Sequence, residues 1–259
     1  MAATTFRGEE DVMPIRGLRA LVVAGGLLVL ALPASLTQAV APKPASAAAA
    51  PACPTFDSSN FHSPTTITNP YFPLTPGDLY TYSGYRKRVP VVDTVYVTKK
   101  TPTKDGIRTV QVRDRVYESG VLTEDTLDWY AQDDQGNVWY VGEFSTELPS
   151  GDHAGSWTAG VDGAQPGYIM EAAPQVGDSY CQENAPDVAQ DAAEVISRTA
   201  SRSVPYGTFS GDVLQTRDYS LIEPHSEYKY YAPGVGMLEA IALNGGREDI
   251  QLETIQHSQ

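Results

Sequence analysis

The sequence has few of the residues and motifs from which recognisable catalytic sites are built. Its 259 residues include only four histidines and two cysteines, which argues against a zinc site. No serine stands in the Gly-x-Ser-x-Gly motif, so the usual nucleophile elbow is excluded. No glycine-rich loop follows a strand and opens a helix, which excludes a phosphate-binding loop. The sequence therefore names no reaction by motif.

Positive charge is also scarce. The chain carries 18 Lys and Arg against 32 Asp and Glu, a net charge of −14. Such a chain repels a phosphate backbone, and we expect no nucleic-acid partner. Acidity favours solubility and the binding of cations, although it does not determine the fold.

The amino terminus has the pattern of a secretory signal. Arg16 and Arg19 precede an apolar run at residues 20–36 and a small-residue stretch at residues 37–41. We predict a signal segment at residues 1–47, with cleavage after Ala41 or Ala47. An uncleaved anchor is the alternative, but the run is shorter than the roughly 20 residues that span a bilayer. The mature protein is thus expected in the medium or at the cell envelope, without an integral membrane span.

Two details qualify this segment. The acidic residues 9–11 do not suit a signal peptide, so translation from Met13 fits the pattern better. The Pro/Ala-rich stretch at residues 42–52 has little to pack and is predicted to be a disordered linker. Residues 53–259 then form a single domain, in which 14 Lys and Arg remain against 29 Asp and Glu after cleavage at Ala47.

Cys53 and Cys181 are predicted to form a disulfide, because an even pair in an exported protein is more often bridged than free. Two separate thiols are the alternative. A lipid-modified Cys53 is disfavoured, since the apolar residues that should precede such a cysteine are missing.

Strand patterns dominate the domain. Runs of β-branched and aromatic residues alternate with short turns rich in Gly, Asp and Asn. Such short separators predict an antiparallel meander of about ten strands. The expected fold is all-β, a curved sheet forming a half-barrel or barrel, which removes exposed edges. The expected strands are residues 79–85, 91–97, 107–117, 121–131, 138–144, 195–203, 212–221, 227–232, 236–243 and 249–255.

Residues 147–186 interrupt this rhythm with six glycines interleaved with aromatics. We predict a long ordered loop or lid over one end of the sheet, because long loops in compact domains are often functional. A short helix is expected near residues 186–194.

Five short segments of the domain have recognisable sequences, at residues 69–77, 114–117, 124–133, 136–140 and 229–236. Together they resemble a family of uncharacterised secreted bacterial proteins that is common in actinobacteria. The resemblance spans residues 56–259 and implies no activity. In that family a histidine often stands at the position of Tyr228, and Cys181 is often another residue. The meander and the Tyr-Tyr-Ala-Pro-Gly-Val-Gly ending also resemble the half-barrel sheet of periplasmic lipoprotein carriers.

Alternation along residues 107–117 gives the clearest candidate site. Asp114 shares a face with three valines, so it points toward the apolar side. A buried carboxylate must be paired, bound to a cation or neutralised. Glu124 and Asp128 share one face of the next strand and could join Asp114 in acid and base work or in holding Ca²⁺. The favoured alternative is a structural ion pair between Asp114 and an arginine such as Arg198 or Arg217.

Other candidate sites are weaker. His225 and Glu227 share a strand face that suits a metal pair, but no third ligand is nominated by spacing. The turn at residues 133–137 carries oxygen ligands but lacks the spacing of a calcium loop, so we predict a hairpin. Some aromatics could line a ligand cavity, although most are expected to pack. The candidate ligand-binding aromatics are Tyr117, Trp129, Trp139, Trp157 and Tyr228.

Two functions remain open. The first is a non-enzymatic binder or carrier that holds an apolar or mixed small ligand, such as an envelope lipid or sugar, in the sheet concavity. It requires an enclosed apolar cavity. The second is a secreted enzyme that uses Asp114 with Glu124 or Asp128 on a polysaccharide or small lipid. It requires those carboxylates to converge, without an arginine on Asp114. No cofactor is expected apart from Ca²⁺.

Overall fold

The structure is a computed structural model that describes residues 50–244 and 248–258. The predicted signal segment and most of the predicted linker lie outside the described residues. One short 3-10 helix, η1 (Ser58–Asn60), precedes the strands. Within the described ranges, no helix is long and apolar enough to cross a membrane.

The described residues form fifteen strands, joined mostly by short turns. Their bounds are β1 (Leu79–Arg86), β2 (Val89–Val97), β3 (Thr103–Lys104), β4 (Ile107–Arg108), β5 (Val110–Glu118), β6 (Val121–Gln132), β7 (Val138–Glu147), β8 (Trp157–Thr158), β9 (Gln165–Met170), β10 (Ser179–Ala185), β11 (Ala189–Val204), β12 (Gly207–Ser220), β13 (Ser226–Ala232), β14 (Gly236–Ala242) and β15 (Glu248–Gln256).

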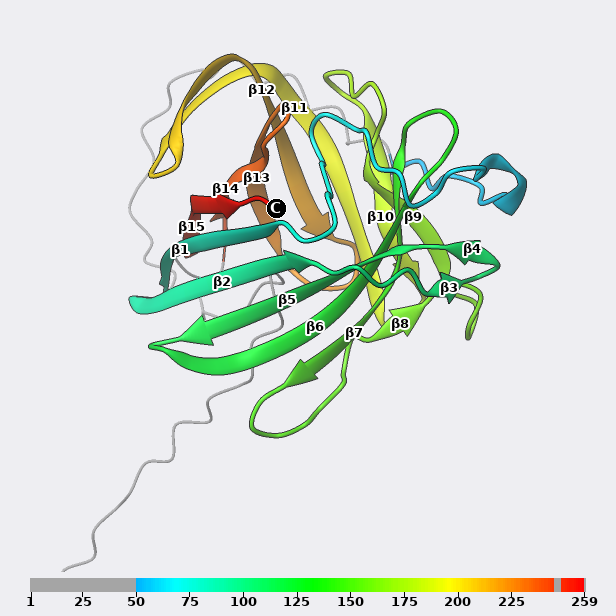
Figure 1. Ribbon diagram of the computed structural model, residues 1–259, viewed down its shortest axis with the longest axis horizontal. Coiled ribbons are helices and arrows are strands. Elements are labelled where there is room, and N and C mark those ends of the chain that lie inside the picture. Colours follow the sequence, from blue (N-terminus) through cyan, green and yellow to red (C-terminus); the bar gives the residue numbers. More distant parts are fainter. Residues whose placement is uncertain (1–49, 245–247, 259) are drawn as a thin grey trace, which may run out of the picture.

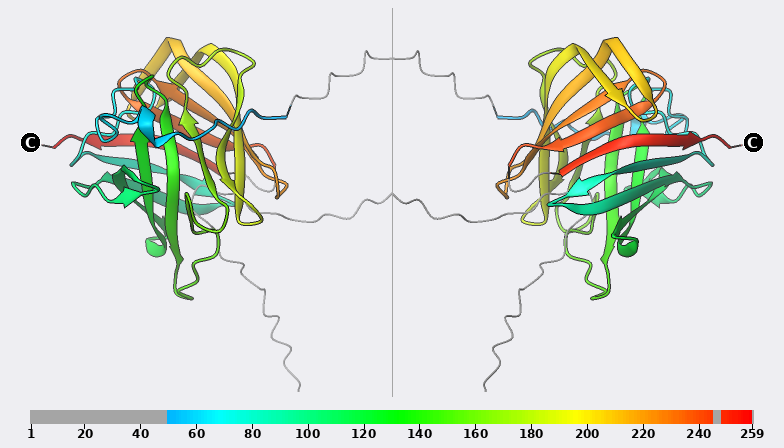
Figure 2. Two further views of the ribbon diagram at one scale, coloured as in Figure 1. Left: turned by 90° about the vertical axis from the view of Figure 1, so that its right-hand side faces the viewer. Right: turned by 90° about the vertical axis from the view of Figure 1, so that its left-hand side faces the viewer.

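Twelve of these strands close into an antiparallel barrel (Figures 1 and 2). The order around the barrel is β6-β5-β2-β1-β15-β14-β13-β12-β11-β10-β9-β7, and β7 pairs back with β6. The short β8 pairs with β7, while β3 and β4 form a separate hairpin. A closed sheet has no free edge, so closure removes the exposed edge strands that an open sheet would have. The prediction of an all-β barrel class is confirmed.

The region predicted as a loop or lid is part of the barrel wall in its second half, whereas residues 148–164 are mostly turns on either side of β8. Residues 165–186 contain β9 and β10, which pair with β7 and β11. The glycine within β9 allows close strand contact: a Cβ on Gly167 would lie 2.3 Å from the carbonyl oxygen of Cys181. Glycine and proline lower β propensity, which hid these strands in the sequence.

The helix predicted at residues 186–194 is wrong. A tight turn follows β10, and β11 begins at Ala189, where it pairs with Ala185. Buried Ala192 and Ala193 make the segment resemble a helix former, but the partner strands on both sides decide its conformation.

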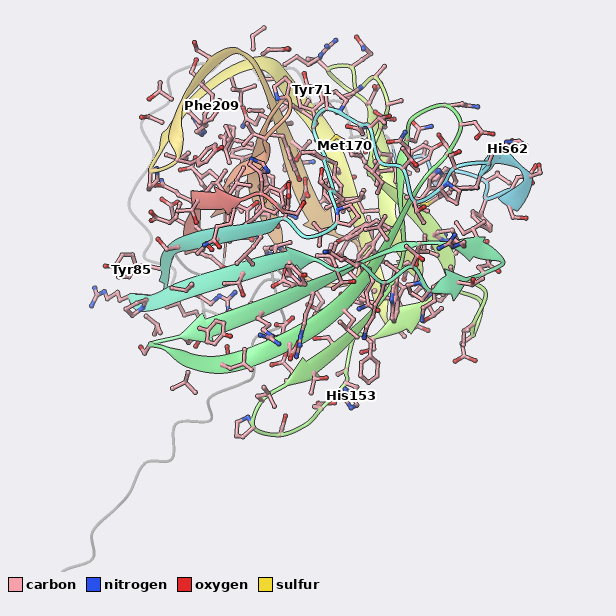
Figure 3. All side chains as sticks on the ribbon, viewed as in Figure 1. His62, Tyr71, Tyr85, His153, Met170 and Phe209 are labelled. Carbon is pink, nitrogen blue, oxygen red and sulfur yellow. A yellow bond between two sulfur atoms is a disulfide. The ribbon has the colours of Figure 1, made fainter. Side chains whose placement is uncertain are left out.

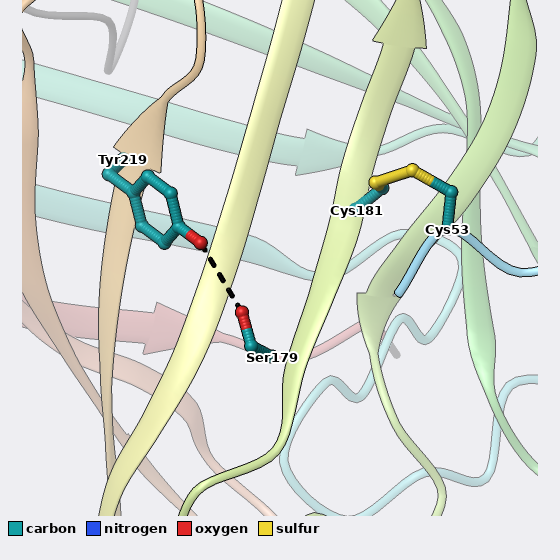
Figure 4. The surroundings of a disulfide bond; sticks show 4 residues. All are labelled: Cys53, Ser179, Cys181 and Tyr219. Atoms are coloured by element: carbon teal, nitrogen blue, oxygen red, sulfur yellow. Dashed lines mark hydrogen bonds between the residues drawn. A yellow bond between two sulfur atoms is a disulfide. The ribbon is translucent and has the colours of Figure 1, made fainter. Parts of the chain in front are cut away.

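The predicted disulfide is confirmed. Cys53 and Cys181 are bonded, with their Cα atoms 4.7 Å apart and a sequence separation of 128 (Figure 4). Ala52 forms a parallel bridge with Tyr180. The bond thus fastens the segment before the barrel to β10 in its wall.

A buried arginine joins three strands of the barrel. Arg86 of β1 is only 5% exposed, and its guanidinium donates to Glu118 at 2.9 Å and to Glu248 at 2.8 Å. These carboxylates lie at the end of β5 and the start of β15. A buried pair of this kind depends on all of its members, because removing one leaves a buried charge.

Candidate ligand cavity

The barrel holds a cavity of about 190 Å³ that is partly open to solvent and lined by many charged groups, so the expectation of an enclosed apolar cavity is wrong. Inward-facing positions of most barrel strands line it. Phe72, Pro73 and Leu74, from the segment that precedes β1 and runs across the barrel in cyan in Figure 1, complete the lining. A cavity near 150 Å³ is enough to hold benzene, so this one has room for a small organic molecule or about six waters.

The lining is strongly acidic. Nine carboxyl side chains reach the cavity, against one lysine and one histidine. Apolar and aromatic side chains, six of them tyrosines, make up most of the remainder. The interior is therefore mixed in character and of one dominant charge sign. The carboxyl side chains belong to Asp93, Asp114, Glu124, Asp128, Glu143, Glu183, Asp191, Asp218 and Glu227.

Strand register brings three of these carboxyls together. Val116 of β5 pairs with Asp93 of β2 on one side and with Glu124 of β6 on the other. Asp114 stands two residues before Val116 on the same inner face, so it is a diagonal neighbour of both acids. We call Asp93, Asp114 and Glu124 the acidic trio.

Burial and mutual repulsion shift the acidic trio toward the protonated form. Burial raises the pKa of Asp93 to about 6, although a hydrogen bond with Asp114 acts the other way. Burial, and then the charge and hydrogen bond of Asp93, hold the pKa of Asp114 well above its usual value. Burial and the charge of Asp114 raise the pKa of Glu124 to about 9. Carboxyls this close cannot all ionise without a cation between them.

Glu124 is the most constrained member of the trio. It is 4% exposed and stands directly opposite Glu147 of β7. Its Oε1 accepts a hydrogen bond from Thr126 Oγ1 at 2.8 Å. Its buried Oε2 accepts none from any residue that the structure describes. A buried acceptor without a donor is costly, and such an atom is a marker for a missing partner.

Asp128 and Glu143 form a second carboxyl pair beside the trio. They are register partners on β6 and β7. The hydroxyl of Tyr140 lies 2.5 Å from Asp128 Oδ1 and 2.9 Å from Glu143 Oε2. Tyr140 stacks on Tyr130, with ring centroids 4.9 Å apart. These rings form an apolar shelf next to the acids.

The other side of the cavity holds its own cation. Lys229 Nζ of β13 lies 3.0 Å from Asp218 Oδ2 and 3.0 Å from Glu227 Oε1. Burial alone would lower the pKa of Lys229, but the two carboxylates raise it well above its usual value. Thr216 and Gln182 also donate to Asp218. An ammonium between two carboxylates is therefore already built into this wall.

The arginine pair favoured for Asp114 is absent from the described residues, because both named arginines lie elsewhere. Arg217 pairs with Glu194 at 2.8 Å. Arg198 forms a side-chain hydrogen bond with Tyr71, whose hydroxyl also donates to Asp212. On the outer face, Arg113 Nε donates to Asp125 Oδ1 at 2.7 Å, so Asp125 points away from Asp114 as the alternation predicted. The structure brings all three predicted carboxylates, Asp114, Glu124 and Asp128, to the cavity.

The five aromatics named as ligand candidates do not line the cavity. Trp139 packs against Phe56 and Phe61 of the amino-terminal segment, outside the barrel. Trp129 lies beneath Lys104 of the β3–β4 hairpin, and Trp157 of β8 contacts Tyr140. Tyr117 and Tyr228 stand opposite Val92 and Arg217, on the outer face of the wall. The aromatics that do line the cavity are Phe72, Tyr80, Tyr82, Tyr130, Tyr140, Tyr219 and Tyr231.

The predicted His225 and Glu227 both line the cavity. Burial and the charge of Lys229 lower the pKa of His225, whereas burial raises that of Glu227 to about 7. Among the described residues, no group of three or more His, Cys, Asp or Glu is placed to hold a metal ion. His62 and His153 lie on loops outside the cavity (Figure 3).

Sequence reasoning missed several acids of the site, among them Asp93, and also Lys229. The pattern Val91-Val-Asp-Thr-Val95 places Asp93 on the same face as buried Val91. The alternation argument used for Asp114 would have found Asp93. The residues 133–137 form the predicted hairpin, in which Asp133 accepts hydrogen bonds from Gln135, Asn137 and Trp139.

Comparisons with known proteins add a fold likeness and nothing about function. No family model matches the sequence, and no curated protein matches it either. The chain is similar to the crystal structure of a "putative exported protein with YmcC-like fold" from Bacteroides fragilis, with a TM-score of 0.44 and 15% identity over 72% of this chain and 99% of that chain. It is also similar to a "putative lipoprotein" from Parabacteroides distasonis, with a TM-score of 0.42 and 16% identity over 72% of this chain and 98% of that one. The resemblance to a secreted actinobacterial family stays a prediction.

Proposed function

We propose that this chain is an exported binding protein that holds one small ligand of mixed polarity inside its barrel. The observation that carries the proposal is the cavity of about 190 Å³, which is lined by polar groups and aromatic rings. A concave site with apolar walls and a few converging polar groups is the usual form of a small-molecule site. The amino-terminal pattern of residues 1–47 and the disulfide support an exported location.

Native mass spectrometry of protein purified from its own culture medium tests this proposal. We expect a small molecule to remain bound to the folded chain. Replacing cavity-lining Val95 by Phe should fill the space and remove the bound mass. Val92→Phe is the matched control, since Val92 lies on the same strand and is 39% exposed. An empty wild-type protein, or equal binding by both variants, would refute the proposal.

A second function has its own supporting observation. Three neighbouring carboxyls with raised pKa values, and no arginine on Asp114 among the described residues, suit general acid and base chemistry. An enzyme would convert its substrate, whereas a binder returns it unchanged. Incubation with oligosaccharides and small lipid esters, followed by product analysis, separates the two. Turnover lost in Asp114→Asn would favour the enzyme.

A further inference from the structure

The acidic trio lacks a cation that its surroundings are built to accept. The guanidinium of Arg86, whose charge acts on Asp93, is held by Glu118 and Glu248. Lys229 is held by Asp218 and Glu227 on the other side of the cavity. Both positive groups are therefore committed to other carboxylates. The trio has no lysine or arginine of its own in the described part of the chain.

A second observation points to a ligand at the same place. Glu124 Oε2 is buried, belongs to a side chain that lines the cavity, and accepts no hydrogen bond from the described residues. Both oxygens of Asp93, which is 1% exposed, likewise receive no hydrogen bond from the amide, hydroxyl or cationic donors described. The Asp114 carboxyl lies beside them, and Arg86 acts on Asp93 through its charge without a hydrogen bond. A ligand that satisfies these acceptors must carry several hydrogen-bond donors and a positive charge.

We infer that the ligand is a small organic cation, a primary amine or diamine, whose ammonium group lies among Asp93, Asp114 and Glu124. The inference rests on the proposed binding function and names its ligand class. An ammonium brings three donors and one charge, which matches unpaired acceptors in three converging carboxyls. Lys229 shows the same chemistry across the cavity, where an ammonium lies 3.0 Å from each of two carboxylates.

The rest of the cavity suits the apolar part of such a molecule. Tyr130 and Phe72 have ring centroids 5.2 Å apart and lie beside the trio. Aromatic faces attract cations and also cover methylene groups. A bare metal ion would leave most of the volume unfilled, whereas an alkyl amine fills it.

Binding of a cation should release protons. In the free protein, the charges of Asp93, Glu143 and Asp125 act on Asp114, and those of Asp114, Glu143 and Glu147 act on Glu124. The cation Arg86 and the acid Asp128 act on Asp93, and Tyr82 and Tyr130 are also close to Asp114. An ammonium among them stabilises the ionised carboxylates and lowers their pKa values. Affinity for the amine is therefore expected to rise between pH 6 and pH 9.

Isothermal titration calorimetry with 1,4-diaminobutane tests the inference on the full mature chain, refolded to remove any bound molecule. The neutral 1,4-butanediol, the anion succinate and Ca²⁺ are titrated in parallel. We expect saturable binding of the diamine alone, with proton release seen as a dependence of the heat on the buffer. Asp114→Asn should weaken binding at least about tenfold, which corresponds to about 1.4 kcal/mol.

The matched control is Asp125→Asn, one strand away and on the outer face. It should change the affinity for the diamine less than twofold. If Asp114→Asn does not fold, Glu124→Gln takes its place. Equal binding in the inner and outer variants would place the amine on the surface and overturn the inference.

Other outcomes separate the inference from the proposed function. Tighter binding of the diol, succinate or Ca²⁺, or a neutral molecule lost in Val95→Phe, would refute the cationic ligand and leave a binding protein standing. If the diamine does not bind, and the protein from the culture medium carries no bound molecule, both the cationic ligand and the proposed binding function are refuted.

Discussion

Replacing Glu124 by Gln should stabilise the protein at neutral and alkaline pH, because it removes a carboxyl that ionises in the unfolded chain but stays protonated in the folded state. Glu124 is buried at the cavity wall opposite Glu147, and its pKa is raised from its ordinary value of 4.5 to about 9 by burial and then by Asp114. The folded state therefore holds a proton that the unfolded chain releases near pH 4.5.

The sign follows from proton linkage. Because the folded state binds more protons than the unfolded chain, the free energy of unfolding falls as the pH rises. This loss is absent below about pH 4.5 and complete above about pH 9. One proton changes the free energy by about 1.4 kcal/mol for each pH unit, so Glu124 alone costs roughly 3 kcal/mol between pH 5.5 and pH 7.5.

Urea denaturation at several pH values measures this effect on ligand-free, refolded protein. Gln keeps the shape of Glu and the contact with Thr126, but it does not titrate. The free energy of unfolding of Glu124→Gln relative to wild type should therefore rise by roughly 3 kcal/mol between pH 5.5 and pH 7.5. Asp134→Asn is the control, since its exposed carboxyl has a lowered pKa, held by hydrogen bonds from His62.

A pH-independent difference between Glu124→Gln and wild type would refute this reasoning. It would mean that Glu124 is ionised and satisfied in the folded state. The acidic trio would then be stable without a proton or a cation.

Three further predictions concern stability, measured by urea denaturation. Replacing Cys53 and Cys181 by Ala should lower the free energy of unfolding by roughly 4 to 5 kcal/mol, because the bond closes a loop of about 128 residues. Adding a reductant to the wild-type protein should lower its free energy of unfolding by the same amount. An unchanged stability would contradict this prediction. Asp133→Ala should cost roughly 3 kcal/mol, since its carboxylate organises the hairpin by accepting from two backbone amides, an amide side chain and an indole; the neighbouring Asp134→Ala should cost much less. Arg86→Ala should lower the free energy of unfolding by about 3 to 5 kcal/mol, because it leaves two carboxylates without their buried partner. A loss of less than about 1 kcal/mol would contradict this, and would show that water replaces the guanidinium.

Much of the fold could be predicted because the strand signal is local. Alternation of apolar and polar residues, with short Gly and Asp turns, located most of the strands from residue 79 to residue 144 and from residue 195 onward. The strands β9 and β10 were missed for a physical reason. In β9, Gly167 allows the close approach of the β10 backbone, and this requirement is invisible without the partner strand. In sequence, the adjacent Pro166 and Gly167 therefore look like a turn.

The candidate site could be predicted only in part for a related reason. Alternation showed that Asp114 points inward, because that depends on its own strand. Its neighbours depend on register: Val116 pairs with both Asp93 and Glu124. The inward position of Lys229 could have been found by alternation, since Glu227, Lys229 and Tyr231 all face the cavity from β13.

The most direct test is a crystal structure, at a resolution that shows ordered water, of protein purified from its own culture medium. The account predicts continuous density for one small molecule inside the barrel, with a nitrogen within hydrogen-bond distance of Asp114 or Glu124. Separate water peaks at hydrogen-bond distance from every cavity carboxyl, with no continuous density, would contradict it.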